Sequence, residues 1–146
     1  SRIMADMNEE LRALGTGKHL TVFCGVIDTE ENLLTYCIGA HYPPPILKNG
    51  DEIQVLAGSG LPLGLFPDAR YEEHRIPLQP RFSLIAFSDG ILEVLPASDL
   101  AAKEALLRTE VAAADGQLEA LAERLGLQKV RDVPDDIALL MIKRDE

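Results

Sequence analysis

Basic residues are scarce in this sequence. Its 146 residues contain 14 Lys and Arg against 24 Asp and Glu, which gives a formal net charge of −10 with neutral histidines. Nucleic-acid phosphates are bound mainly by Lys and Arg, so this balance argues against a nucleic-acid-binding protein. The same excess of carboxylates is compatible with divalent cations, whose protein sites are built from oxygen ligands.

Long apolar runs are also missing. No uninterrupted stretch is long enough to span a bilayer, and the sequence does not open with a basic stretch followed by an apolar one. With 47% hydrophobic and 26% charged residues, the composition is typical of a soluble globular protein of one domain. We therefore expect no membrane association and a cytoplasmic location.

Cysteine is rare as well: Cys24 and Cys37 are the two in the chain, and both lie inside apolar, strand-like runs. Neither has the spacing of a metal site. We interpret them as small buried hydrophobic residues, with a disulfide or a catalytic thiol as the less favoured alternative.

The first part of the chain predicts a helix and a hairpin. Apolar residues recur every three or four positions in residues 2–14, which indicates one face of a helix, and a Gly-Thr-Gly segment ends it. Residues 21–27 and 33–38 are apolar and rich in β-branched side chains, and the polar residues 28–32 between them are typical of a hairpin loop. We expect the two strands to pair antiparallel.

The middle of the chain is rich in proline and glycine. The segment GAHYPPPIL, residues 39–47, predicts a bend or an edge segment rather than a central strand, because proline cannot donate to a ladder. The next residues, KNGD, predict a turn, and a short strand follows with Ile53 and Val55. We expect an ordered loop over residues 57–69 and two further strands, a half-buried one ending at Leu78 and a more buried one over 82–87.

The last third changes to helical periodicity. Apolar residues from Leu100 to Leu125 recur at spacings of three, four and seven, interrupted at Asp115-Gly116, which predicts two helices with Asp115 as the N-cap of the second. Residues 137–142 predict a final strand. Strands in succession followed by clustered helices predict the α+β class, with helices packed on sheet faces, and not a doubly wound parallel sheet.

Acidic residues stand at the ends of two of these strands. Asp89 follows the strand FSLIAF after one serine, and Asp135 and Asp136 precede the strand IALLMI. If the strands are antiparallel neighbours, these acids meet at one edge of the sheet, where a cation would relieve their repulsion. Because no His or Cys is nearby, Mg²⁺ or Mn²⁺ is favoured over Zn²⁺. The alternative is structural, since Ser-Asp-Gly is a common turn and Asp-Asp after proline can cap the start of a strand.

Four segments, spread from Thr21 to Arg144, resemble one family in the right order. FSDGILEV resembles the [FY]-[ST]-D-G-x-x-E signature of the metal-dependent PPM-type serine/threonine phosphatases of the SpoIIE/RsbU branch. DDIALLMIKR resembles the final D-D-x-T-x-L strand of that branch. IGAHYPPPIL is similar to its A-G-H-x-P-P segment, and GLPLGLF is similar to its G-x-P-L-G loop.

The resemblance implies a fold, a cofactor and a substrate. The fold is a PPM-type β-sandwich with flanking helices, and two Mg²⁺ or Mn²⁺ ions at one edge activate a water that attacks a phosphoserine or phosphothreonine. Asp89 and Asp135 match metal ligands and are the implied catalytic residues, with Asp136 where a neighbouring Asp or Asn usually stands. The implied substrate is a phosphorylated anti-sigma-factor antagonist in bacterial stress signalling, with a receiver or sensor domain upstream.

The sequence also departs from the family. The G-G-D and D-x-x-G-x-G motifs that supply the other metal ligands are not found, so we expect residues 1–146 to be the C-terminal portion of one phosphatase domain, without its N-terminal strands and first helix, and inactive alone. Pro80-Arg81-Phe82 stands at the family's P-G-D, and Ala138 replaces the Thr of D-D-x-T. The alternative function is a degenerate, inactive module that binds a regulator or a sigma factor.

Three further residues are weaker candidates. We interpret His41, in the proline-rich bend, as a structural hydrogen-bonding residue, with a role toward substrate or metal-bound water as the alternative. His74 alternates inward with Ile76 and is interpreted as a core histidine. Glu93 falls where the family has an acid after the glycine turn, and we expect it to hold the loop that follows Gly90.

Overall fold

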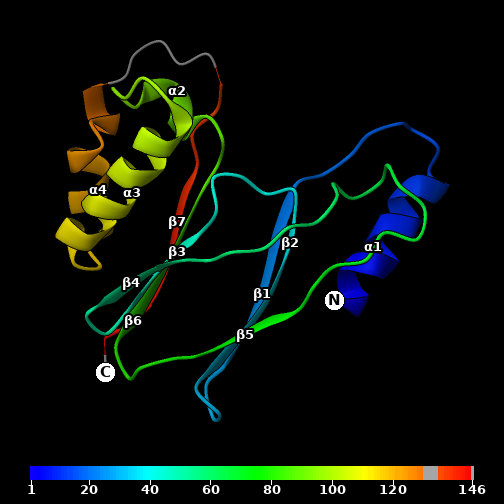
Figure 1. Ribbon diagram of the computed structural model, residues 1–146, viewed down its shortest axis with the longest axis horizontal. Coiled ribbons are helices and arrows are strands. Elements are labelled where there is room, and N and C mark those ends of the chain that lie inside the picture. Colours follow the sequence, from blue (N-terminus) through cyan, green and yellow to red (C-terminus); the bar gives the residue numbers. More distant parts are fainter. Residues whose placement is uncertain (130–134, 146) are drawn as a thin grey trace. The chain divides into compact units, whose positions relative to one another are not determined.

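The computed structural model describes residues 1–129 and 135–145. The chain divides into two compact units, both visible in Figure 1. Unit 1 consists of residues 1–41 and 57–78, and unit 2 consists of residues 42–56 and 79–146.

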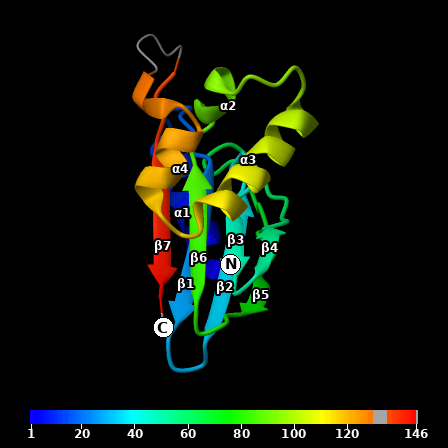
Figure 2. The same cartoon turned by 90° about the vertical axis from the view of Figure 1, so that its left-hand side faces the viewer.

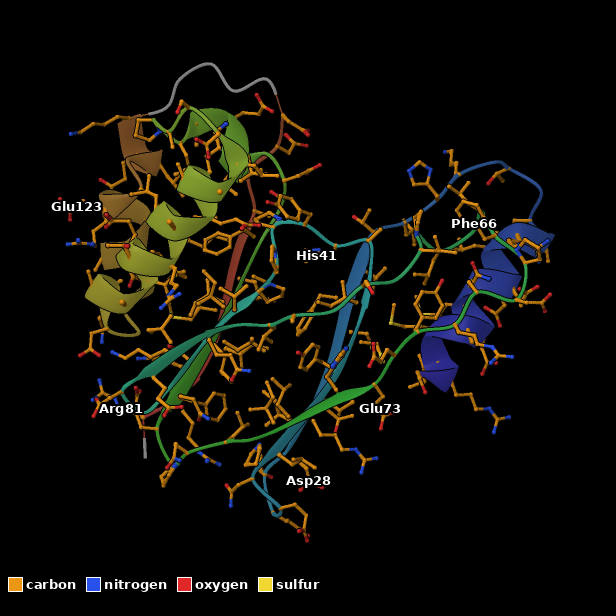
Figure 3. The ribbon with its side chains drawn as sticks, viewed as in Figure 1. Asp28, His41, Phe66, Glu73, Arg81 and Glu123 are labelled. Atoms are coloured by element: carbon orange, nitrogen blue, oxygen red, sulfur yellow. The ribbon has the colours of Figure 1, made fainter. Side chains whose placement is uncertain are left out.

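Unit 1 contains one helix and a three-stranded antiparallel sheet. The helix is α1 (Arg2–Ala13), and the sheet has the order β1 (Val22–Asp28), β2 (Leu33–Gly39) and β5 (His74–Pro77). At the tip of the β1–β2 hairpin, the Asp28 carboxylate (Figure 3) accepts the backbone N–H groups of residues 30 and 31, each at 2.9 Å. The predicted helix and antiparallel hairpin are therefore confirmed.

The loop over residues 57–69 is ordered by its bonds to α1. Asn8 is fully buried, and its amide donates to the carbonyl of Phe66 at 3.0 Å and accepts the N–H of Gly64 at 2.8 Å. Phe66 accordingly lies beside the helix in Figure 3. Because both ends of a buried amide are satisfied, the helix and the loop are fixed together. The residues buried together in this unit are Met4, Cys37, Leu63, Ala69 and Tyr71.

The two cysteines behave as apolar residues. Cys37 is buried, Cys24 is half-buried and packs against the same cluster, and both thiols are free. They lie directly opposite each other in the β1–β2 register.

Unit 2 contains a four-stranded antiparallel sheet. Its order is β4 (Glu52–Val55), β3 (Ile46–Asn49), β6 (Phe82–Phe87) and β7 (Leu139–Arg144), and Figure 2 shows the four strands side by side. The strand predicted over residues 82–87 is found with those bounds.

The prediction of a bend followed by a turn is wrong at Ile46–Asn49. These four residues pair with β4 on one side and with β6 on the other, so β3 is a central strand. The three prolines end just before it, at Pro45, and leave the N–H groups of the strand intact. The turn is confined to Gly50 and Asp51.

Helices cover one face of this sheet. They are α2 (Ile91–Val94), α3 (Leu100–Ala114) and α4 (Leu118–Arg124), followed by a 3₁₀ turn (Leu127–Lys129), and Figure 2 shows α3 and α4 in front of the strands. Alternate residues of β6 point into the helices, because side chains along a strand alternate between its faces. The core of the unit includes Ile85, Phe87, Ile91, Leu107, Val111 and Leu121.

The role predicted for Asp115 is wrong. It is the C-cap of α3, in a left-handed conformation with φ of 46°, and α4 begins after Gln117. Its carboxylate is bound by the side chains of Lys48 and Arg81. Asp115 therefore ends α3 and does not begin α4, and its side chain binds residues far away in the chain.

Tyr42 joins the proline-rich bend to α3. Its hydroxyl donates to Glu104 at 2.6 Å, and burial together with this bond raises the pKa of Tyr42 to about 12. The Tyr42–Pro43 peptide bond is cis.

Two antiparallel sheets and four α-helices in the described parts of the chain confirm the α+β class. Among the same residues, no helix has the length and apolar character needed to cross a membrane.

Candidate functional site

The two acidic segments meet at one end of the β6–β7 pair. Phe87, the last residue of β6, lies opposite Leu139, the first residue of β7. Beyond this pair, the backbone N–H of Ser88 donates to the carbonyl of Ala138 at 3.0 Å. The ladder thus continues past both strands into the segments that carry the acids. We call this end, Ser88–Gly90 with Asp135 and Asp136, the acidic edge.

Ser88 joins the two segments through its side chain. Its hydroxyl accepts the N–H of Ala138 at 2.7 Å and donates to the carbonyl of Asp136 at 2.9 Å. A hydroxyl used both as acceptor and as donor fixes the backbone on either side of Ile137. The sequence gives no sign of this role, because a serine before Asp-Gly carries no signal of a partner so far along the chain.

Gly90 is required by close packing of the backbone. A Cβ atom at this position would lie 2.4 Å from the carbonyl oxygen of Asp136 and 3.2 Å from that of Asp135. Real atoms do not approach so closely, so a side chain here would push the two segments apart. The glycine therefore allows Asp89 to lie next to the Asp135–Asp136 segment.

The carboxylates of the acidic edge lie on segments open to solvent. Asp135 accepts the backbone N–H of Asp136 at 2.8 Å. The Asp89 carboxylate has no hydrogen-bond or ion-pair partner among residues 1–129 and 135–145, although backbone groups beside it are paired. Oxygen atoms without a protein cation nearby are the donor set that Mg²⁺ and Mn²⁺ take in proteins.

The acidic edge holds too few ligands for a complete metal centre. In the parts of the chain that the structure describes, no three His, Cys, Asp or Glu side chains are grouped so that they could hold a metal ion. Pro134, part of the predicted cap at the start of the last strand, lies outside the described residues.

The weaker candidates make contacts of their own. In unit 1 the His41 ring packs against Phe23, with ring centroids 6.4 Å apart, and the half-buried His74 stacks on Tyr36 at 5.1 Å. Glu93 is the third residue of α2 and is exposed, and its side chain bonds to no described residue. Backbone bonds hold the loop after Gly90 instead, including that from the N–H of Leu92 to the carbonyl of Asp89 at 2.9 Å.

The comparison with protein families covers almost the whole chain. A family model described as Stage II sporulation protein E (SpoIIE) matches residues 1–145. The chain belongs to the SpoIIE family. It is a PPM-type domain of the SpoIIE/RsbU branch, a family of phosphatases.

Solved structures show the same PP2C phosphatase fold. The phosphatase domain of the cell fate determinant SpoIIE from Bacillus subtilis matches with a TM-score of 0.68 at 16% identity, over 99% of this chain and 73% of that one. The RsbU and RsbW domains of Rv1364c from Mycobacterium tuberculosis match with a TM-score of 0.74 at 24% identity, over 93% and 40%. RsbX in complex with magnesium matches with a TM-score of 0.68 at 17% identity, over 95% and 63%.

A curated relative is much longer than this chain. Protein IcfG from Synechocystis sp. is 25% identical over 130 residues, which are 86% of this chain and 20% of that protein. The chain therefore spans about a fifth of the length of that relative.

Proposed function

We propose that this chain supplies the Asp89 and Asp135 ligands of a two-metal Mg²⁺ or Mn²⁺ site that hydrolyses phosphoserine or phosphothreonine in a regulatory protein. The observation that supports the proposal is the convergence of two acidic segments, distant in sequence, at one edge where Asp89 has no cation partner among the described residues. When bound at these ligands, two such ions would supply a water of lowered pKa and positive charge toward the phosphoryl group.

The residues of the acidic edge have separate tasks in this proposal. Asp89 and Asp135 provide metal-binding oxygens, and one oxygen of Asp135 is already oriented by the N–H of Asp136. Ser88 and Gly90 position the two segments, the first by its two hydrogen bonds and the second by its missing side chain. No nucleophilic side chain is needed, since water attacks the phosphorus.

The branch of the family supports a proposal for the substrate. We propose a phosphorylated anti-sigma-factor antagonist as the substrate, in bacterial stress signalling in the cytoplasm, with a receiver or sensor domain upstream in the longer protein. Relatives with this fold have been crystallised with magnesium or after soaking in manganese, which supports the choice of metals.

A second candidate function is a binding module without turnover. It is favoured by the small number of ligands, since the described residues contain no group of three metal-binding side chains. In this case the fold would hold a regulator or a sigma factor on its surface.

The decisive experiment measures Mn²⁺-dependent phosphate release from a phosphoserine protein by the longer protein that contains this chain. We expect Asp89→Asn to reduce the rate by roughly 10²–10³-fold, because a charged ligand of the transition-state cations is lost. The matched control is Asp51→Asn, an exposed acid in the β3–β4 turn of the same unit, which should keep the rate. Equal rates for wild type and Asp89→Asn would remove this residue from the mechanism.

The 146-residue chain itself provides the complementary test. We expect it to release phosphate no faster than the buffer, because Asp89 and Asp135 alone cannot complete two metal sites. Rapid Mn²⁺-dependent release by this chain would contradict the expectation. Absence of release by the longer protein, together with capture of a regulator or sigma factor, would support the binding module.

A further inference from the structure

The opposite end of β6 carries a row of two lysines and a serine. Lys48 of β3 lies opposite Ser83 of β6, and Ser83 lies opposite Lys143 of β7. Residues directly opposite in antiparallel strands have their side chains on the same face of the sheet. This is the face that the helices cover, because Ile85, two residues after Ser83, is part of the core under them.

Ser83 is a largely buried polar residue, 4% exposed, whose hydroxyl makes no hydrogen bond to another described residue. It lines a small cavity with Lys48, Arg81 and Lys143. The cavity has a volume of about 10 Å³, which is near the lower limit for one oxygen atom.

Gly116 lies next to the Ser83 hydroxyl and has no side chain to cover it. It follows the C-cap of α3 with φ of +71°, and a Cβ atom there would lie 3.7 Å from the Oγ of Ser83. A larger side chain at this turn would cover the serine. The α3–α4 turn, which supplies Asp115 and Gly116, therefore lines the same cavity as the row of three residues.

The charged side chains around the cavity carry more positive than negative charge. Lys48 and Arg81 bind the carboxylate of Asp115, and Lys143 lies 3.1 Å from Asp145. Three cations thus face two carboxylates in a chain whose net charge is −10. Arg81 is exposed and uses one nitrogen for Asp115, so its guanidinium retains other donors. Figure 3 shows Arg81 at the end of unit 2 that lies away from α2.

Arg144 also lines the cavity, but its guanidinium is engaged by other groups. It is in the neighbouring register position, opposite Phe82, and its guanidinium lies over that ring at 5.2 Å. It donates to the carbonyls of Pro80 and Gln79 at 2.7 and 2.8 Å. The Arg144 guanidinium therefore binds the segment that leads into β6 and the first residue of that strand.

We propose that Ser83, Lys143 and Arg81 form a binding site for a phosphate group, which we call the oxyanion site. One phosphate oxygen enters the cavity and accepts the hydrogen bond of the Ser83 hydroxyl, and the others face the ammonium of Lys143 and the unused N–H groups of Arg81. Charge-assisted hydrogen bonds of this kind are the strongest that proteins offer to an oxyanion. Lys48 and Arg81 already bind one oxyanion, the Asp115 carboxylate, which shows that these side chains approach such groups.

The oxyanion site does not depend on the proposed phosphatase activity. The oxyanion site lies at the start of β6, and the acidic edge follows the end of the same strand. Phosphate binding at the oxyanion site therefore needs no metal ion at the acidic edge. The phosphate group has two possible sources, free inorganic phosphate and a phosphorylated peptide, and both present the same tetrahedral oxygens.

The experiment titrates the protein with inorganic phosphate by calorimetry, at constant ionic strength and with a chelator that keeps the acidic edge free of divalent ions. We expect Ser83→Ala and Lys143→Gln each to weaken binding by roughly tenfold, since each removes a donor to a charged acceptor. Lys143→Arg should restore most of the affinity. Arg75→Gln is the matched control, because it removes the same charge from β5 of unit 1 and should change binding less than twofold.

We expect the Ser83→Ala variant to fold as the wild type does, so a loss of phosphate binding would not come from unfolding. Ser83→Ala loses no hydrogen bond to a described residue, so its unfolding in urea without phosphate should match that of wild type. A titration with a phosphoserine peptide and its unphosphorylated form separates the two sources, because a peptide-specific site binds the former more tightly than inorganic phosphate. Undetectable phosphate binding by wild type in both titrations, or equal weakening by Lys143→Gln and Arg75→Gln, which indicates an adventitious ion only, would overturn the proposal.

Discussion

The two ends of β6 satisfy their polar groups in opposite ways. At the acidic edge the Ser88 hydroxyl makes two hydrogen bonds, while the neighbouring carboxylate of Asp89 has no partner among the described residues. At the start of the strand the charges are paired through Asp115, while the Ser83 hydroxyl is the group without a described partner. Among the described residues, an anion without a partner thus follows the end of β6, and a donor without a partner lies among cations at its start.

This difference shows where a ligand of each charge is expected. An unpaired group costs free energy when it loses water, so a folded chain leaves such groups only where solvent or a ligand reaches them. Asp89 fits a cation, and Ser83 between two lysines fits an anion. The two proposals can therefore be tested separately with variants of the same strand.

The largest effect is expected from the glycine of the acidic edge. Gly90→Ala places a Cβ atom 2.4 Å from the carbonyl oxygen of Asp136, so the backbone must move. Because Gly90 has an ordinary φ of −53°, the cost is steric, and we expect a loss of about 3 kcal/mol in the free energy of unfolding. Unfolding in urea measures it.

The matched variant at the other end is Gly116→Ala. Its nearest contact is at 3.7 Å, and its φ of +71° leaves only the cost of a left-handed alanine, about 1 kcal/mol. Gly126→Ala, at +72° with no atom within 4 Å, should show the same cost. If Gly90→Ala were no more harmful than these two, the close approach of the acidic segments would be refuted.

The next largest effect on the free energy of unfolding is expected at the two serines near the ends of β6. Ser88→Ala removes a donor and an acceptor and leaves the N–H of Ala138 without its side-chain partner, so we expect a loss of about 2 kcal/mol. Ser83→Ala removes a hydroxyl without a described partner, and we expect a change of less than about 0.5 kcal/mol. Equal losses in urea unfolding would contradict the contrast between the two ends.

The smallest expected effect is on the pH dependence of the free energy of unfolding. The hydrogen bond from Lys48, followed by the attraction of Lys48 and Arg81, lowers the pKa of Asp115 below its ordinary value of 3.8. A carboxyl group whose pKa is lowered in the folded protein stabilises it above the ordinary pKa, and this contribution is lost as the pH falls through the folded pKa. Asp115→Asn should therefore reduce the loss of stability between about pH 5 and pH 3.

The measurement is urea unfolding at several pH values in that range. The effect is small because the group is exposed and salt screens it. In a Lys48→Met background the effect of Asp115→Asn should shrink further, because the largest cause of the lowered pKa is gone. An unchanged effect in that background would assign the pH dependence to other groups.

Local patterns predicted several elements correctly. The periodicity of residues 2–14 predicts α1, since the spacing of apolar residues on a helix is a local property. The hairpin of β1 and β2 is predicted by two apolar runs and a polar loop, and β6 by one apolar run. The short α2 has no such signal, because four residues are fewer than two helical turns.

The sequence by itself determined the α+β class, most strands and the identity of the acids at the acidic edge, because spacing and residue type are encoded over a few neighbouring positions. Only the tertiary structure decided that Ile46–Asn49 is a central strand, that Asp115 is bound by Lys48 and Arg81, and that Lys48, Ser83 and Lys143 form one row. The physical reason is register: which residues lie opposite each other depends on the pairing of strands far apart in the chain, and a shift of one residue would turn every side chain to the other face.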